Sequence, residues 1–503
     1  MAWTRRSFVK LPALAAAGWM ANSAWARSVD NSVHSAANHE PVPDDIYTLA
    51  DYCLGIRYET LPPNVVAVTK GQILDTIAVA LPALNADGIK QLYAWGQETG
   101  GKQESLVLGT GARMPAEKAA RQNAAMAAAL EFDDTYEASL MHASCVTIPV
   151  ALAVADLTGK VSGKDLIAAV ATGTDVACRL SRAGSPGVSP FIVGWDPTPM
   201  YGFLSAALVA GRLLELNREQ MVAAAGLAYH QLAGNAQAAV DGALAKRLGA
   251  GFAAYGGVMS ARLAQRGVLG TYHVLDGAKG LFKQYHGGKE SKEALLGDLG
   301  TSFAGPDIAP KPYPCCRGGH VAIDAALELV VHNDIKPEAV ERVVIHSPPA
   351  EMMLLGAPLE KKQNPKTIVE AQFSNPWMVA AAIQDRHVGL NHFTLEALRR
   401  ADLKALVKRI STAEDKTLVR PDGGPGFARL EIKTRDGKTY VTEVKYAKGD
   451  PRNPMTPDEI ENKFYECTDA AGMARDQARR ITKRVRDLEL EQNVADLSAA
   501  LTI

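Results

Sequence analysis

The feature that most constrains this chain is a series of helix-patterned segments whose apolar faces consist largely of alanine and glycine. Apolar residues recur at helical spacing through nearly everything between residues 63 and 300. Small side chains let helix axes approach closely, so we expect these helices to pack into one large, tight helical domain. The predicted helices include residues 115–132, 148–159, 163–180, 198–216, 217–234 and 246–267.

The pattern changes at the proline-rich segment GPDIAPKPYPCC, residues 305–316, which predicts a domain boundary. Beyond it, predicted helices alternate with a strand at residues 341–347 and a hairpin around Asp436-Gly437. The helical pattern then returns, with Thr456 suited to cap a helix that begins at Pro457. We therefore predict a mainly α fold. An all-helical domain comprises residues 44–307 and 455–503, and a smaller α+β domain comprises residues 308–454.

The N-terminus predicts an export signal over residues 1–26. Arg5 and Arg6 form a twin-arginine pattern, and a short apolar run follows, ending in the small-residue site Ala24-Trp25-Ala26. A membrane anchor is the alternative, but the apolar run is shorter than the roughly 20 residues that span a bilayer. We expect a mature protein that is periplasmic and soluble, with no membrane contact after signal cleavage.

Charge and cysteine content exclude several classes of function. The 54 basic and 55 acidic residues leave almost no net charge, so the sequence predicts no nucleic-acid partner. The six cysteines are scattered, without the CxxC pairs typical of zinc, redox or iron–sulfur sites. Cys315 and Cys316 could bind a metal together with His320, but buried structural thiols are the favoured interpretation.

The segment EFDDTYEASLMHAS, residues 131–144, is the strongest candidate for chemistry. Glu131, Asp133 and Asp134 follow a predicted helix, where the helix dipole and mutual repulsion disfavour ionisation, so one of them could hold a proton near neutral pH. His142 lies just before the next helix, whose N-terminal field favours a neutral imidazole. A carboxyl group beside a neutral imidazole suits proton transfer at carbon. A solvated acidic loop with an incidental histidine remains the alternative.

Three cationic or titratable residues elsewhere could bind an anion. Lys246 precedes a helix rich in glycine and alanine, where it could hold a substrate carboxylate or simply lie at the surface. Arg317 and His320 flank Gly318 and Gly319, which would let a ligand approach the backbone at a helix start. Together these groups predict a polyanionic small molecule as ligand.

Several of these motifs together resemble the MmgE/PrpD family, which includes 2-methylcitrate dehydratase and cis-aconitate decarboxylase. The resemblance covers nearly the whole mature chain. It implies a helical domain built from both ends of the chain, a smaller α+β domain and a homodimer. It also implies an active site between the domains, without metal or organic cofactor. The matching segments are ILDTIAVALPA, AALEFDDTYEASLMHAS, GTDVACRL, KRLGAGFAAYGGVMSARLA, KPYPCCRGGHVAIDA, EAQFSNPWMVAAAI and NPMTPDEIENKF.

The resemblance also implies which residues form the site. The family motif DFDDT, with its first acid and its threonine in the site, corresponds to Glu131 and Thr135. The family histidine, lysine and PCCR-closing histidine correspond to His142, Lys246 and His320. The chain departs from the family pattern in two places that bear on the reaction. A glutamate replaces the first aspartate of the motif, and Asp196 in GWDPTPMYG stands where the decarboxylase has a histidine.

These observations predict a cofactor-independent lyase, more specifically a hydro-lyase, for a small di- or tricarboxylic acid of the citrate or 2-methylcitrate type. Lys246, Arg317 and His320 would bind the carboxylates and stabilise the enolate-like charge that develops when a proton leaves the neighbouring carbon. Thr135 and Asp134 would complete the substrate site.

For proton transfer, His142 would act as base or acid at carbon, and Glu131 or Asp196 would protonate the departing hydroxyl. Three alternatives stay open from the sequence. The chain could be a polycarboxylate epimerase or isomerase, a decarboxylase, or a non-catalytic periplasmic polycarboxylate-binding protein.

Overall fold

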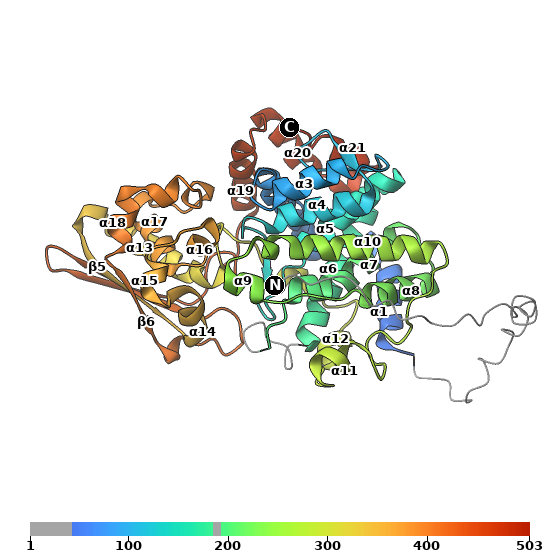
Figure 1. Ribbon diagram of the computed structural model, residues 1–503, viewed down its shortest axis with the longest axis horizontal. Coiled ribbons are helices and arrows are strands. Elements are labelled where there is room, and N and C mark those ends of the chain that lie inside the picture. Colours follow the sequence, from blue (N-terminus) through green and yellow to red (C-terminus); the bar gives the residue numbers. More distant parts are fainter. Residues whose placement is uncertain (1–42, 185–192) are drawn as a thin grey trace, which may run out of the picture. The chain divides into compact units, whose positions relative to one another are not determined.

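The computed structural model describes residues 43–184 and 193–503, and most of these residues are helical, which confirms the mainly α prediction (Figure 1). The predicted export signal lies outside the described residues. The longer helices of the N-terminal half are α1 (Asp45–Gly55), α2 (Pro63–Ala80), α3 (Ile89–Glu98), α4 (Ala116–Ala128), α5 (Ser144–Thr158), α6 (Gly163–Gly184), α7 (Pro197–Leu213), α8 (Arg218–Tyr229) and α10 (Gly249–Gln265). The shorter ones are α9 (Gln237–Asp241), α11 (Leu281–His286) and α12 (Lys292–Leu296).

Glycine and alanine allow the close helix packing that the sequence predicted. On α10, a Cβ atom added to Gly257 would lie 2.3 Å from the Cβ of Ala206 on α7 and 2.7 Å from the backbone nitrogen of Ala207. On α6, a Cβ atom added to Gly173 would lie 2.1 Å from a methyl group of Val209. These helices therefore pack at distances that larger side chains would prevent.

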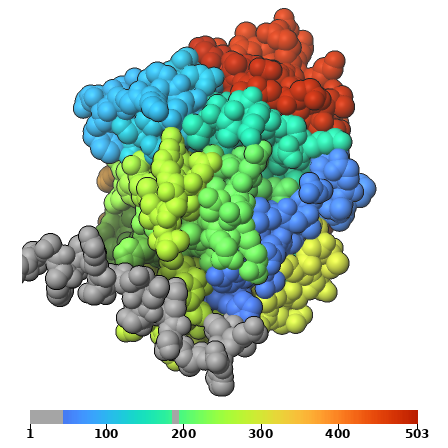
Figure 2. All heavy atoms as spheres, turned by 90° about the vertical axis from the view of Figure 1, so that its right-hand side faces the viewer, coloured from blue at the N-terminus to red at the C-terminus, as the bar shows by residue number. Residues whose placement is uncertain are grey.

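The C-terminal helices return to the N-terminal ones, as predicted. Helix α19 (Pro457–Ala470) packs against α2, and α21 (Ala495–Ala499) packs against α5. Figure 2 shows the C-terminal residues, in red, directly beside residues coloured blue to turquoise. Thr456 caps α19 by accepting a hydrogen bond from the backbone of Glu459, which confirms the predicted helix start. Lys463 on α19 forms a buried ion pair of 2.6 Å with Asp75 on α2.

One stretch in the helical part is long and apolar enough to cross a membrane by length and composition. It runs from Pro63 to Ala83, and 67% of its most apolar window is buried inside the protein. Its apolar character therefore fits its position as a core helix, because α2 contacts α4, α5, α6 and α19.

The helical part is not entirely helical, which corrects one detail of the prediction. Strand β1 (Ser105–Leu106) pairs with β2 (Arg113–Met114), and β3 (Thr135–Tyr136) pairs with β4 (Ile308–Ala309). Each strand is two residues long and provides hydrogen bonds to buried backbone groups in loops. Two residues are too few to show the alternating pattern by which a strand is predicted from sequence. The second pair joins the acidic segment after α4 to the proline-rich segment.

Residues 315–447 build a second hydrophobic core around a four-stranded sheet with the order β6-β5-β7-β8. The strands are β5 (Val340–Ser347), β6 (Ile410–Glu414), β7 (Ala428–Thr434) and β8 (Thr439–Val444). The predicted strand and hairpin are confirmed as β5 and as β7–β8, whereas β6, which runs parallel to β5, was not predicted. Helices α13 (His320–His332) and α17 (Asn375–Asp385) pack against this sheet and each other, and α18 (Ala401–Val407) packs against α17. The division into two domains at these boundaries stays a prediction.

We predict that Gly257→Ala destabilises the protein by about 1–3 kcal/mol, because the added methyl group overlaps the backbone of α7. Gly71→Ala on α2 is the matched control, since its added Cβ would meet only a methyl group of Ile460 at 3.6 Å. The control should keep or raise stability, because alanine favours a helix over glycine by about 0.5–1 kcal/mol. Thermal unfolding by circular dichroism measures both. Equal melting temperatures for the two variants would contradict the packing argument.

Candidate functional site

The loop between α4 and α5 carries four carboxylates that are almost completely buried. Glu131, Asp133, Asp134 and Glu137 have exposed fractions of 6%, 6%, 2% and 5%. Ionised carboxylates are very costly to bury without partners, so this loop requires compensating cations or protons. The backbone turns sharply at its first acid, because Glu131 has a φ of 54° in the left-handed region.

Two lysines neutralise the first two carboxylates. Lys246, in the turn before α10, forms an ion pair with Glu131. Lys311 lies 3.7 Å from both the Glu131 and the Asp133 carboxylates and donates a hydrogen bond of 3.1 Å to the Glu131 carbonyl. Lys311 is 1% exposed, whereas Lys246 retains 24% of its side-chain exposure. Lys246 is therefore the cation that a ligand can reach more easily.

Lys311 was missed in the sequence analysis, although it begins the segment KPYPCC that carries the family resemblance. A lysine between prolines gives no helical or strand pattern that would place it. Only a count of the buried carboxylates in the facing loop could have shown that a second buried cation was needed.

His142 is held by its Nδ1 atom. Nδ1 lies 2.7 Å from the backbone carbonyl of Asp134 and 3.2 Å from the carboxylate of Asp133. A carbonyl oxygen only accepts, so Nδ1 carries the hydrogen of that bond. Within residues 43–184 and 193–503, Nε2 makes no hydrogen bond. Nε2 is therefore the ring nitrogen on which His142 can take or give a proton, while Nδ1 is held by Asp133 and Asp134.

Two threonines adjoin this imidazole. The Thr135 hydroxyl lies 3.4 Å from Nδ1, at the long end of hydrogen-bond distances. The Thr198 hydroxyl accepts a hydrogen bond of 3.1 Å from the backbone nitrogen of His142. The first turn of α7 therefore fixes the backbone position of the histidine.

The three acids of the EFDDT motif differ sharply in pKa. Burial alone would raise the pKa of Glu131, but Lys246 and Lys311 outweigh burial and hold it below its ordinary value. Asp133 is also buried, yet His142 and Lys311 hold its pKa below the ordinary range. Burial raises the pKa of Asp134 to about 7; the Ser144 hydroxyl opposes this rise, and Asp75 and Asp133 add to it. The protonated carboxyl that the sequence analysis expected near neutral pH is therefore Asp134.

Asp196 lies at the first turn of α7, where it caps the helix. Its carboxylate accepts a hydrogen bond of 3.1 Å from the backbone nitrogen of Thr198. Burial raises its pKa, and the positive charges of Lys246 and His142 oppose that rise. Thr198 links this carboxylate to the histidine, because its backbone nitrogen donates to Asp196 and its hydroxyl accepts from the backbone nitrogen of His142.

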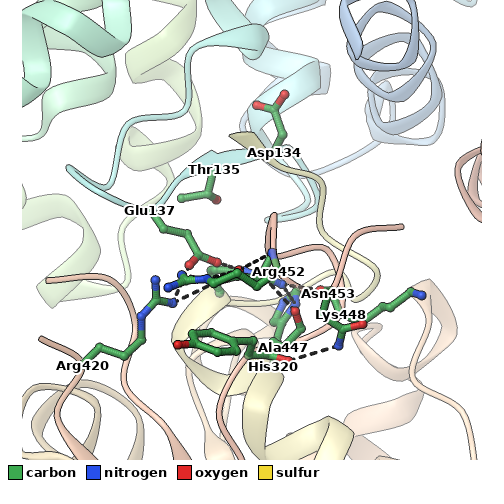
Figure 3. Close-up of polar contacts among 12 residues, drawn as sticks. Asp134, Thr135, Glu137, His320, Arg420, Ala447, Lys448, Arg452 and Asn453 are labelled. Carbon is green, nitrogen blue, oxygen red and sulfur yellow. Dashed lines mark hydrogen bonds and ion pairs between the residues drawn. The ribbon is translucent and has the colours of Figure 1, made fainter. Parts of the chain in front are cut away.

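Arg317 and His320 form a second cluster, centred on Glu137. Figure 3 shows Glu137 together with Arg420 and His320. Arg317 binds one Glu137 oxygen at 2.6 Å, and Arg420 binds the other at 2.7 Å. Arg317 also donates to Nδ1 of His320 at 3.1 Å, and Nε2 of His320 lies 3.2 Å from the carbonyl of Cys315. Burial and the charge of Arg317 lower the pKa of His320 well below its ordinary value.

Both side chains in this second cluster are thus occupied by protein groups, and among the described residues neither forms a hydrogen bond or ion pair with His142 or Lys246. The glycines between them have a packing reason, since a Cβ atom on Gly319 would lie 2.5 Å from the terminal methyl group of Met378. The structure therefore brings Glu131, Thr135, His142, Lys246 and Asp196 together. It places Arg317 and His320 on Glu137 instead.

The α+β part of the chain also contacts the acidic loop. Gln372 donates hydrogen bonds to the carbonyls of Leu130 at 2.8 Å and Pro314 at 3.1 Å. The ring of Phe373 lies 5.7 Å from the Lys246 ammonium, close enough for a cation–π contact. These residues were not predicted, because nothing in their own segment indicates which loop they meet.

The described part of the chain contains no group of three or more His, Cys, Asp or Glu side chains arranged to hold a metal ion. All six cysteines are free thiols. Burial raises the pKa of Cys316 to about 11, so this thiol stays protonated at neutral pH. Both ring nitrogens of His320 are engaged, one by Arg317 and the other by the carbonyl of Cys315.

A mainly helical protein with one histidine, two lysines and several buried carboxylates at a single loop is equipped for acid–base chemistry on a small anion. Family models identify its relatives. The MmgE/PrpD N-terminal domain matches residues 47–294, and the MmgE/PrpD C-terminal domain matches residues 313–490. The chain belongs to the MmgE/PrpD family.

Curated relatives of the chain include cis-aconitate decarboxylases. A cis-aconitate decarboxylase-like protein of Aspergillus oryzae is 26% identical over 90% of this chain and 96% of its own length. The cis-aconitate decarboxylase of Aspergillus terreus is 24% identical over 95% of this chain and 97% of its own length. The human cis-aconitate decarboxylase is 24% identical over 89% of this chain and 92% of its own length.

We predict that the neighbouring variants Asp134→Asn and Asp133→Asn change stability in opposite directions. Between about pH 4 and pH 7, the folded protein keeps a proton on Asp134 that the unfolded chain has already lost. The free energy of unfolding therefore falls as the pH rises through this window. Asp134→Asn removes this loss and should stabilise the protein at pH 8 by about 2–4 kcal/mol.

Asp133 is the opposite case, because its pKa is lower in the folded protein than in the unfolded chain. Ionised Asp133 stabilises the folded protein above about pH 4, and this stabilisation is lost as the pH falls and the carboxylate is protonated. Asp133→Asn should therefore cost about 3–5 kcal/mol at pH 8, since it leaves a buried cation without its partner. Melting temperatures of both variants and the parent at pH 5 and pH 8 measure the effect. Destabilisation of similar size by both variants at pH 8 would contradict the assignment.

Proposed function

We propose that this protein is a lyase for a small di- or tricarboxylic acid, and more specifically a hydro-lyase of the 2-methylcitrate or citrate type. Membership of the MmgE/PrpD family and the decarboxylase relatives support a lyase on a tricarboxylic acid. The observation that carries the chemistry is the orientation of His142. Its Nδ1 is fixed on the Asp134 carbonyl and the Asp133 carboxylate, which leaves Nε2 free to take a proton.

In this mechanism, Nε2 of His142 removes a proton from the carbon beside a substrate carboxylate. Negative charge then develops on that carboxylate as an enolate, and the ammonium groups of Lys246 and Lys311 stabilise it. In the structure without substrate, Glu131 and Asp133 neutralise both ammonium groups. The substrate must therefore displace Glu131 from Lys246, the more exposed of the two cations.

The hydroxyl group that leaves the substrate needs a proton to depart as water. Glu131 is poorly suited to supply it, because its two lysine partners lower its pKa and keep it ionised. Asp196 is better suited, since burial raises its pKa. We assign Asp196 as the acid for the hydroxyl group and Glu131 as the residue that positions Lys246.

Decarboxylation is the second candidate, and the names of the curated relatives favour it. There the C–C bond to a carboxylate breaks and carbon dioxide leaves. The electron pair of that bond stays on the substrate as a carbanion, which takes a proton from Nε2 of a His142 that enters the reaction as the imidazolium. The same histidine and lysines serve both reactions. Asp196 bears on the choice, because a carboxyl group at this position can supply a proton to a leaving hydroxyl, a step that decarboxylation does not need.

The two reactions are distinguished by incubating the purified mature protein with 2-methylcitrate, citrate and cis-aconitate. Proton NMR follows the formation of the unsaturated acid, and release of labelled carbon dioxide follows decarboxylation. Turnover to an unsaturated acid with all carboxyl carbons retained supports the hydro-lyase, whereas labelled carbon dioxide supports the decarboxylase. Deuterium exchange at substrate carbon without water loss would indicate an epimerase or isomerase. Binding without any turnover would leave only a polycarboxylate-binding protein.

We predict that His142→Gln lowers kcat by about 10²–10⁴-fold, because it removes the proton carrier while the lysines still bind the carboxylates. His230→Gln is the matched control, since His230 is exposed and lies outside this group of residues. The KM of the His142 variant should change little, because the loss falls on proton transfer rather than on binding. Steady-state kinetics on the substrate found above provide the measurement. A fall of less than tenfold in kcat would remove His142 from the mechanism.

We further propose that the chain is exported by the twin-arginine pathway to the periplasm and forms a homodimer. The Arg5-Arg6 pattern supports the first proposal and family membership supports the second. Cell fractionation of the parent and an Arg5→Lys, Arg6→Lys variant tests export, and light scattering of the purified protein tests the dimer.

A further inference from the structure

A cavity of about 530 Å³ lies beside the acidic loop but contains none of the residues proposed for proton transfer. Helices α2, α19 and α20 (Arg475–Arg486) contribute to its wall, together with residues 306–310 and 449–457. Most of the lining is apolar, as in small-molecule sites, which typically occupy roughly 300–1,000 Å³. The apolar lining includes Val68, Leu74, Ile308, Met455, Ile460 and Val485.

The lining also contains buried hydrogen-bond acceptors without donors. Asp134 lines this cavity. The Ser144 hydroxyl lies close enough to lower the pKa of its carboxyl group, but neither carboxylate oxygen makes a hydrogen bond of normal geometry to any described residue. Figure 3 shows its carboxylate pointing away from Glu137 and the arginines. Gln72 also lines the cavity; its amide nitrogen donates to the carbonyl of Gly305 at 3.0 Å, and its amide oxygen has no partner among those residues. Buried acceptors of this kind require a donor from a ligand or from water.

The charged groups of the lining favour a cationic ligand. The cations already have partners, because Lys70 pairs with Glu489, and Arg486 pairs with Glu461. Asp75 forms an ion pair of 2.6 Å with Lys463. The carboxyl group of Asp134 is therefore the charged group of the lining that is left for a ligand.

We propose that this cavity binds a small organic ammonium ion with an apolar body, such as an aryl-alkyl or alkyl primary amine. The ammonium group donates hydrogen bonds to the Asp134 carboxylate and the Gln72 amide oxygen, and the apolar body packs against the residues of α2, α19 and α20. A primary ammonium carries three donors and no acceptor, which matches a set of acceptors that have no donors. This site is independent of the proposed lyase reaction.

Such a ligand would lie one residue from the proton-transfer group. The carbonyl of Asp134 holds Nδ1 of His142 at 2.7 Å, and the Asp133 carboxylate holds the same atom at 3.2 Å. An ammonium ion on the Asp134 side chain thus acts on the same residue whose backbone orients the histidine. An effect of the bound ammonium ion on catalysis would therefore be transmitted through Asp134.

The test uses isothermal titration calorimetry of the full mature protein at pH 7.5 with three isosteric probes. These are 2-phenylethylamine, which is cationic, 2-phenylethanol, which is neutral, and phenylacetate, which is anionic. We expect the amine to bind at least tenfold more tightly than either of the others. Asp134→Asn should reduce this preference for the amine to less than threefold, with the melting temperature confirming that the variant is folded.

Two tryptophan variants on α2 locate the binding site. Ala67 is exposed and lines the cavity, so Ala67→Trp should block it without disturbing the core and weaken amine binding at least tenfold. Asn64 is exposed on the same helix but lies outside the lining, so Asn64→Trp should leave binding unchanged. Absence of amine binding, equal binding of all three probes, or binding that survives Ala67→Trp would overturn the proposal and indicate a cavity filled only by solvent. None of these outcomes depends on lyase activity.

Discussion

The rest of the structure depends on the cost of burying four carboxylates in one loop. No segment of the loop itself supplies enough positive charge, so the compensating cations come from far along the chain. Lys246 and Lys311 reach the start of the loop, while Arg317 and Arg420 hold Glu137 near its middle. Breaking one such buried pair typically costs several kcal/mol, so the helical part, the proline-rich segment and the α+β part are tied together electrostatically at this loop.

The carboxylates of the same loop have two different roles, one near the proposed proton transfer and one in ion pairs with arginines. Of its two lysine-paired acids, Asp133 contacts His142, where proton transfer is proposed. Its arginine-paired acid, Glu137, is held by Arg317 and Arg420. Asp134 belongs to neither set, because its carboxyl group has no cation and its pKa rises to about 7. The loop thus places a carboxyl group that titrates near neutral pH one residue from a carboxyl group that stays ionised, a difference that sequence composition alone does not show.

Elements with a repeating or local sequence signal were predicted correctly, whereas very short strands and the contacts of single residues were not. The alanine-rich helices, the hairpin and the capped start of α19 all carry repeating or local signals, and the structure confirms them. Strand β6 and the two-residue strands are too short to show alternation, and they form because distant backbone groups need partners. Lys311 was missed for a similar reason, since its role depends on which carboxylates lie opposite it. The placement of Arg317 and His320 on Glu137 could not be seen from a glycine-rich helix start, which is equally compatible with an anion site.

The sequence by itself determined the family, the mainly helical architecture and the identity of the acidic segment around His142. These follow from periodicity, capping signals and motifs, all of which act over a few residues. Only the tertiary structure decided which cation meets which carboxylate, which acid keeps its proton and which histidine has a free ring nitrogen. Those properties depend on burial and on distances between side chains more than 100 positions apart, such as Glu131 and Lys311, which local sequence patterns do not encode.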